Sequence, residues 1–269
     1  GVVVVRSAWA PRRLLGGSSS APHRQMLSLL LTSLANDPAN SWLSYAAWTS
    51  PSGKPISFVN TSWVVPNDPA QSYGSNAPGW WYGIQTSNGD GALIQPILAY
   101  GYQGSFYSIF NACFDWTDGS WHTSPETYTV KPGDLITSSI TFDGASTYTM
   151  TISSRDTGKV ITTPYTLEKR QSEPETTVYF VLEHQPRSCK AYPAGGAMTF
   201  EHIHVGVDGQ IVPNVQWEAR QQEPACSSKA VVVDAQTLKF TWNPAANAAA
   251  ANQSLAAAPP KWGAGAAAQ

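Results

Sequence analysis

Short runs of alternating apolar and polar residues fill the middle of the chain, and turn-forming residues separate them. The run 127–130 is followed by Lys-Pro-Gly-Asp at 131–134 and then by the alternating run 135–142. A period of two places successive side chains on opposite faces of a strand, and Pro-Gly and Asp-Gly pairs favour tight turns. The segment therefore predicts two strands joined as a hairpin.

Turn-forming residues also separate predicted strands further along the chain. Asp143-Gly144, Asp156-Thr157-Gly158 and the sequence 207–210 each separate two β-type runs. Many short strands at such spacing, with almost no helical periodicity between them, indicate two packed antiparallel sheets. The pattern predicts an all-β fold, a double-sheet antiparallel β-sandwich.

Both ends of the chain differ from this middle part. Residues 1–40 contain a Val run, an Arg pair, a Gly/Ser stretch and a Leu-rich segment whose spacing favours an amphipathic helix. From residue 244 onward Ala dominates, and the apolar variety that a packed core requires is missing. We expect an N-terminal extension or propeptide remnant over 1–40, a sandwich domain over 41–243 and an Ala-rich tail over 244–269.

Charge and composition narrow the possible partners. Charged residues make up 13% of the 269 residues and the net charge is −2, whereas soluble proteins average about 25% charged residues. Lys and Arg are scattered, so we expect no nucleic acid as partner. No apolar run approaches the length of about 18 residues that would span a membrane. The abundance of Trp, Tyr, Ser, Thr, Gly and Pro is typical of a secreted, extracellular β protein.

The three cysteines allow at most one internal disulfide. We favour a bond between Cys189 and Cys226, because both lie in loop-like sequence; three free buried thiols remain the alternative. Asn60-Thr61-Ser62 and Asn252-Gln253-Ser254 are glycosylation sequons. They suggest a glycoprotein, although such short patterns often occur by chance.

Two polar residues stand out at the ends of apolar strands. Gln95 follows Ala92 to Ile94, and Glu183 follows Val178 to Leu182. A buried amide without partners is costly, and a carboxyl in apolar surroundings has a raised pKa, so both are functional candidates. The alternative is that they are ordinary polar residues satisfied by backbone or solvent.

Other catalytic signatures are weak in this sequence. His202 and His204 alternate on one strand face as zinc ligands can, but no third ligand accompanies them. There is no Gly-x-Ser-x-Gly, no His-Glu-x-x-His and no phosphate-binding glycine loop. We expect neither a metal nor a cofactor.

Five segments, taken in order, resemble the eqolisin family of glutamic endopeptidases. They are residues 41–48, 57–66, 79–85, 92–96 and 178–184. The segment from Trp81 to Gln95 matches the family's Trp-x-Gly-Ile motif and its interval to a catalytic Gln, and Glu183 ends a strand of the type that carries the catalytic Glu. Ser41 to Tyr45 is similar to an Asn-Trp-x-Gly-Tyr motif with two substitutions.

This resemblance implies a concanavalin-like jelly roll and an endopeptidase that acts on polypeptides. Gln95 and Glu183 would be its catalytic pair, with the Glu taking a proton from water and the Gln stabilising the oxyanion. Trp42, Trp81 and Gln85 would line the substrate cleft; the alternative for the two tryptophans is that they are core aromatics. A catalytically silent sandwich that binds carbohydrate or assembles through its terminal extensions remains the alternative, since one fold hosts many functions.

The sequence departs from the family pattern at two positions. Gln85 and Ala99 stand where the family carries Asp. Neighbouring carboxylates raise the pKa of a central Glu, so their loss predicts a less acidic optimum or a weak activity.

Overall fold

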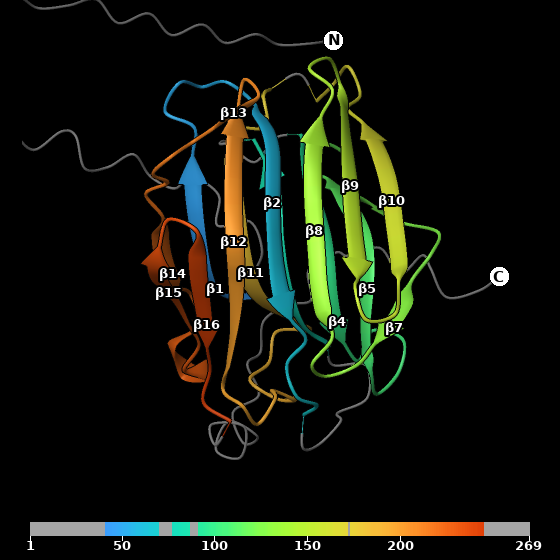
Figure 1. Cartoon of the computed structure of the whole chain (residues 1–269), viewed down its shortest axis with the longest axis vertical. Coiled ribbons are helices and arrows are strands. Elements are labelled where there is room, and N and C mark those ends of the chain that lie inside the picture. Colours follow the sequence, from blue (N-terminus) through green and yellow to red (C-terminus); the bar gives the residue numbers. More distant parts are fainter. Residues whose placement is uncertain (1–40, 70–76, 87–90, 172, 245–269) are drawn as a thin grey trace, which may run out of the picture. The chain divides into compact units, whose positions relative to one another are not determined.

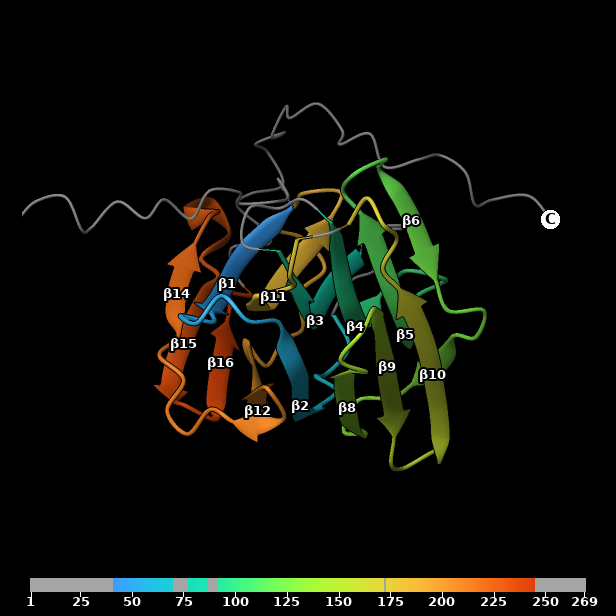
Figure 2. The same cartoon turned by 90° about the horizontal axis from the view of Figure 1, so that it is seen from above.

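The computed structural model describes residues 41–69, 77–86, 91–171 and 173–244, which form sixteen strands and one short 3-10 helix, η1 (Pro224–Cys226). The strands build two antiparallel sheets that pack face to face (Figures 1 and 2). This confirms the predicted double-sheet sandwich.

We name the two layers sheet A and sheet B. Sheet A has the order β14 (Glu218–Gln221), β1 (Trp42–Thr49), β11 (Thr177–Gln185), β3 (Ala77–Gln85), β4 (Ala92–Tyr100), β5 (Tyr107–Asp115) and β6 (Ser120–Thr123), and β7 (Tyr128–Val130) also pairs with β5. Sheet B has the order β10 (Lys159–Thr166), β9 (Thr147–Ser154), β8 (Leu135–Phe142), β2 (Ile56–Val64), β12 (Ala197–Val207), β16 (Thr237–Thr241) and β15 (Lys229–Asp234), and β13 (Gln210–Ile211) also pairs with β12.

The turn at 131–134 does not join a hairpin, and that prediction is wrong. β7 pairs with β5 in sheet A, whereas β8 pairs with β2 and β9 in sheet B. The turn therefore carries the chain from one sheet to the other. The turns at Asp143-Gly144, Asp156 to Gly158 and 207–210 each separate two strands, as predicted, and the strands that they join are paired.

Apolar residues gather in two places. The main core lies between the sheets, where alternate residues of strands such as β9 point inward. A second apolar cluster lies on the outer face of sheet A; its members are Trp42, Tyr45, Ala47, Trp81, Leu93, Ile97, Ala99, Phe110, Ala112, Phe114, Tyr179 and Val181. All residues of β4 and β5 are buried, in keeping with their mostly apolar sequences.

A disulfide joins Cys189 and Cys226, as predicted, and Cys113 is a free, buried thiol. The bond ties the segment that follows β11 to η1. Asn60 of the first sequon is exposed on β2, whereas Asn252, the extension 1–40 and the tail from residue 245 lie outside the described residues. Within the described ranges, no helix is long and apolar enough to cross a membrane.

Candidate active site

Gln95 and Glu183 lie on the same face of sheet A. On β4, Gln95 alternates with Leu93 and Ile97, which belong to the outer apolar cluster. On β11, Glu183 continues the alternation of Tyr179 and Val181, which belong to the same cluster. Because side chains two residues apart share a face, both candidates project from the outer side of sheet A.

The strand register separates the two residues along the sheet. Glu183 pairs with Gly79 on β3, which pairs with Ala99 on β4. Gln95 lies beside Gly83, where an added Cβ would come within 3.2 Å of the Gln95 Cβ. The two backbones are thus about 10 Å apart across the sheet and about 13 Å apart along it. The separation is too long for a direct hydrogen bond between the two side chains. Trp81 lies between Gln95 and Glu183 along the sheet.

Three donors hold the Glu183 carboxylate. Ser41 Oγ donates to Oε1 over 2.7 Å, and Gln185 Nε2 donates to the same oxygen over 2.8 Å. Trp81 Nε1 donates to Oε2 over 2.7 Å. The carboxylate is therefore fixed in place from three segments of the chain.

Burial and hydrogen bonding act on Glu183 in opposite directions. Burial raises the pKa of its carboxyl above the ordinary value, and the bonds from Ser41, Gln185 and Trp81 lower it in part. Burial is the larger effect, because charge is poorly solvated among apolar groups. The side chain nevertheless stays partly exposed, so water can reach it.

The two predicted cleft tryptophans lie beside Glu183. Trp42 pairs with Glu183 across β1 and β11, and its ring packs edge-on against Trp81 with centroids 4.9 Å apart. Trp42 also contacts Tyr45 and Tyr179 edge-on, at 5.7 and 5.1 Å. These four rings form an aromatic floor on one side of the carboxylate.

Gln85 lies away from Glu183 and near Gln95. It follows Gly83 by two residues on β3, on the face that Gln95 shares. Gln85 and Gln95 are only 1% and 3% exposed, and both amide atoms of Gln85 and Oε1 of Gln95 have no hydrogen-bond partner among the described residues. Such atoms gain from any ligand that supplies a matching group.

Sequence reasoning missed Ser41 and Gln185 as partners of Glu183. The alternation along β11 could have indicated Gln185, which lies two residues after Glu183 on the same face. Ser41 is 142 residues away in the sequence, and only the pairing of β1 with β11 brings it close.

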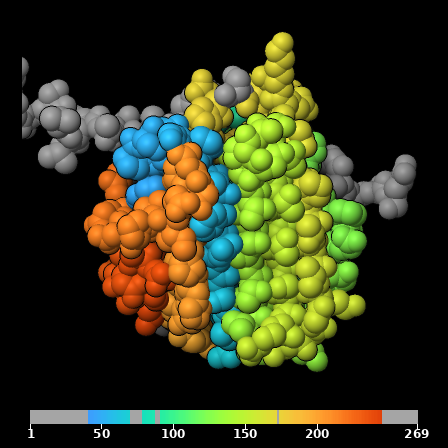
Figure 3. All heavy atoms as spheres, turned by 45° about the horizontal axis from the view of Figure 1, so that its top comes forward, coloured from blue at the N-terminus to red at the C-terminus, as the bar shows by residue number. Residues whose placement is uncertain are grey.

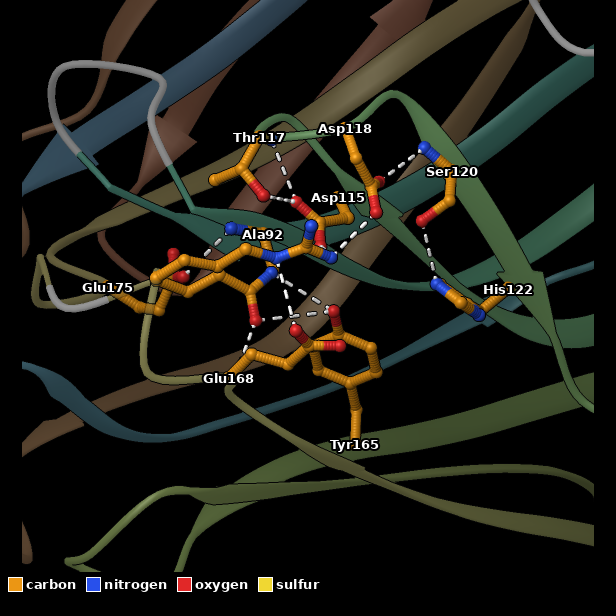
Figure 4. Close-up of polar contacts among 11 residues, drawn as sticks. Ala92, Asp115, Thr117, Asp118, Ser120, His122, Tyr165, Glu168 and Glu175 are labelled. Atoms are coloured by element: carbon orange, nitrogen blue, oxygen red, sulfur yellow. Dashed lines mark hydrogen bonds and ion pairs between the residues drawn. The ribbon is translucent and has the colours of Figure 1, made fainter.

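A second polar cluster lies where β5 ends (Figure 4). Arg170 forms an ion pair with the buried Asp115 at 2.8 Å and with Asp118 at 2.6 Å. Asp115 also accepts hydrogen bonds from Thr117. Each of these charges has a partner, so we interpret this cluster as a structural contact that joins β5, β6 and the segment after β10.

His202 and His204 both have polar neighbours. His202 contacts the Ser62 hydroxyl at 2.9 Å, and His204 contacts the Gln236 amide at 3.2 Å. No group of three or more His, Cys, Asp or Glu side chains with metal-binding geometry occurs within the part of the chain that the structure describes.

Fold and site together define an all-β sandwich with a carboxyl-centred site on the outer face of one sheet. The chain belongs to the Peptidase A4 family, whose model matches residues 44–239.

Solved structures agree in fold. Scytalido-glutamic peptidase with a transition state analog inhibitor is 17% identical, with a TM-score of 0.58, and the match covers 76% of this chain and 99% of that one. SCP-B, a member of the eqolisin family in complex with the tripeptide Ala-Ile-His, is 18% identical, with a TM-score of 0.55 and the same coverage. No curated protein sequence matches the chain.

Proposed function

We propose that this protein hydrolyses peptide bonds at the outer face of sheet A, with Glu183 as the acid–base residue and Gln95 as its amide partner. The observation that carries the proposal is the Glu183 carboxyl itself. It is partly exposed, its pKa is raised by burial, and three donors fix its position. At a pH above its raised pKa, a carboxylate held in this way can remove a proton from water.

The chemistry needs only these side chains, water and the substrate. Glu183 takes a proton from the water, and the water oxygen bonds to the carbonyl carbon of the substrate. The Gln95 amide donates a hydrogen bond to the oxyanion that forms. Breakage of the C–N bond then releases an amine that takes the proton from Glu183. A peptide bound above Trp81 would lie between the two residues.

Secretion and glycosylation are also part of the proposal. The Cys189–Cys226 disulfide supports an oxidising compartment, and the exposed Asn60 offers an accessible sequon on β2.

A Glu183→Gln variant tests the central role, because it removes the base and conserves the shape. We expect the hydrolysis of a denatured protein, measured from acidic to neutral pH, to fall by at least ~100-fold. Glu218→Gln is the matched control: Glu218 is an exposed carboxyl on β14 of the same sheet. A folded Glu183→Gln variant that keeps most of the rate would reject Glu183 as the base.

A second candidate function is binding without catalysis. The separation of Gln95 from Glu183, together with the uncharged Gln85 and Ala99, favours it. If wild type is inactive at every pH while a peptide or an oligosaccharide still binds and quenches the tryptophan fluorescence of the aromatic floor, this candidate replaces the peptidase.

A further inference from the structure

Strand β15 forms one edge of sheet B and exposes three consecutive valines. Its neighbour in the sheet is β16. Val231, Val232 and Val233 are 41%, 39% and 57% exposed, and the strand lies at the red-orange side of the molecule in Figure 3. An uncovered apolar edge strand is a template for pairing with another strand.

Two of the other three sheet edges carry features that hinder such pairing. β10, the opposite edge of sheet B, contains Pro164, which cannot donate a backbone hydrogen bond. β14, at an edge of sheet A, has the charged Glu218 and Arg220. On β15 the charges stand only at the two ends, Lys229 and Asp234. The centre of this edge thus carries neither a charge nor a proline.

We propose that two copies of this chain associate by antiparallel pairing of their β15 strands around a two-fold axis at Val231. Antiparallel pairing centred on Val231 brings Lys229 of one copy opposite Val233 of the other, and the extra residue in β15 lets Asp234 lie at the same level. Lys229 of each copy then faces Asp234 of the other. The opposite charges at the two ends make the strand complementary to itself.

The side-chain directions agree with this register. The ladder between β15 and β16 shifts after Val232, so that Val233 is an extra residue. Val232 pairs with the buried Leu238, whereas Lys229 and Asp234 pair with the less buried Thr241 and Thr237. Because of the extra residue, Lys229 and Asp234 share the outer face.

A two-fold axis perpendicular to the sheet keeps each face continuous across the junction. Val231 then meets its own copy, Ala230 meets Val232, and Lys229 meets the bulge at Val233 and Asp234. Neither Lys229 nor Asp234 has an ion pair with another described residue. Association would therefore create two identical ion pairs without breaking one.

The interface is small, because β15 has six residues. Interfaces well below ~1,200 Å² are characteristic of weak, reversible complexes. We expect a monomer–dimer equilibrium that shifts with protein concentration and weakens in high salt.

Charge exchange at the strand ends tests the pairing. Sedimentation equilibrium of the full chain, from about 1 µM to about 1 mM, should show wild-type dimers. Lys229→Asp and Asp234→Lys should each weaken association by at least ~10-fold, because like charges then meet. An equimolar mixture of the two variants, and the double variant with both exchanges, should restore dimers. Lys159→Asp on β10 is the control and should dimerise as wild type does.

Three results would overturn the proposal. They are a wild type that stays monomeric over the whole range, single variants that dimerise as wild type does, and a mixture that forms no dimer. Circular dichroism and the thermal midpoint of each variant show whether it is folded, and neither readout depends on peptidase activity.

Discussion

Two opposing effects, burial and hydrogen bonding, determine the pKa of Glu183. Burial raises its pKa, and hydrogen bonds from Ser41, which precedes β1, from Trp81 on β3 and from Gln185 on β11 limit the rise. A general base works only when it is deprotonated, so the rate falls as pH drops through this pKa. The raised pKa therefore predicts an acid limb of the pH–rate profile that lies above the ordinary pKa of 4.5.

The two lost family acids have different neighbours in this structure. Ala99 lies across Gly79 from Glu183, whereas Gln85 lies beyond Gly83 and near Gln95. Only a carboxylate at position 99 would thus stand close to Glu183. Both losses were expected to act on the pKa of Glu183, and the register leaves that role to position 99 alone. Because a neighbouring carboxylate raises the pKa of the base, its loss moves the acid limb to lower pH, which is opposite to the less acidic optimum expected from the sequence.

Ala99→Asp should move the acid limb to higher pH by about one pH unit, because a second negative charge roughly 10 Å away disfavours ionisation of Glu183. The measurement is kcat/KM against pH for a peptide substrate. Gln85→Asp serves as the comparison and should leave the acid limb near its wild-type position. Equal shifts in the two variants would contradict the assignment.

At the scale of strands, Gly83 determines how closely β3 and β4 approach beside Gln95. A Cβ at this position would lie 2.7 Å from the carbonyl oxygen of Ile94 and 3.2 Å from the Cβ of Gln95. Contacts this short require the strands to move apart, because backbone atoms cannot turn away.

Gly83→Ala should therefore destabilise the protein by about 1–3 kcal/mol and lower activity by displacing Gln95. Urea unfolding measures the first effect and peptide hydrolysis the second. Gly79→Ala is the stability control, since its Cβ would meet the Leu98 carbonyl oxygen at an ordinary 3.5 Å. Similar unfolding midpoints for the two variants would show that β3 and β4 have room to separate.

The sequence predicts strands well and their partners less well. The alternation in β9 gave its buried face directly. The turn at 131–134 misled the prediction, because turn residues mark a chain reversal without stating which strands then pair. The offset between Gln95 and Glu183 depends on register across three strands, which no local pattern encodes.

For the whole molecule, two buried groups make stability depend on pH in opposite directions. Glu175 is fully buried; its Oε1 accepts a bond from the Ala92 N–H, and its Oε2 has no partner among the described residues. Burial raises its pKa well above the ordinary value. His184 is also fully buried, and burial lowers its pKa to about 4.

The direction of each pH effect follows from the protonation state that the folded protein favours. The folded protein favours protonated Glu175, so this contribution to stability is complete below the ordinary pKa of 4.5 and is lost as pH rises through the folded pKa. The folded protein favours neutral His184, so its contribution is complete above pH 6.5 and is lost as pH falls toward 4.

Glu175→Gln separates these two contributions, because the amide stays neutral at every pH and can still accept the Ala92 bond. Its neighbours Cys113 and Tyr148 also have pKa values raised by burial and remain neutral, so they supply no compensating charge. The thermal midpoint should exceed that of wild type near pH 7, by about 2–4 °C for each kcal/mol gained, and the gain should shrink below pH 4.5 as wild-type Glu175 becomes protonated. Glu173 is exposed and lies two residues before Glu175 in the sequence. A Glu173→Gln variant should therefore have the thermal midpoint of wild type at both pH values. A difference between Glu175→Gln and wild type that is the same at pH 3 and pH 7 would show that the ionisation of Glu175 has no part in the pH dependence of stability.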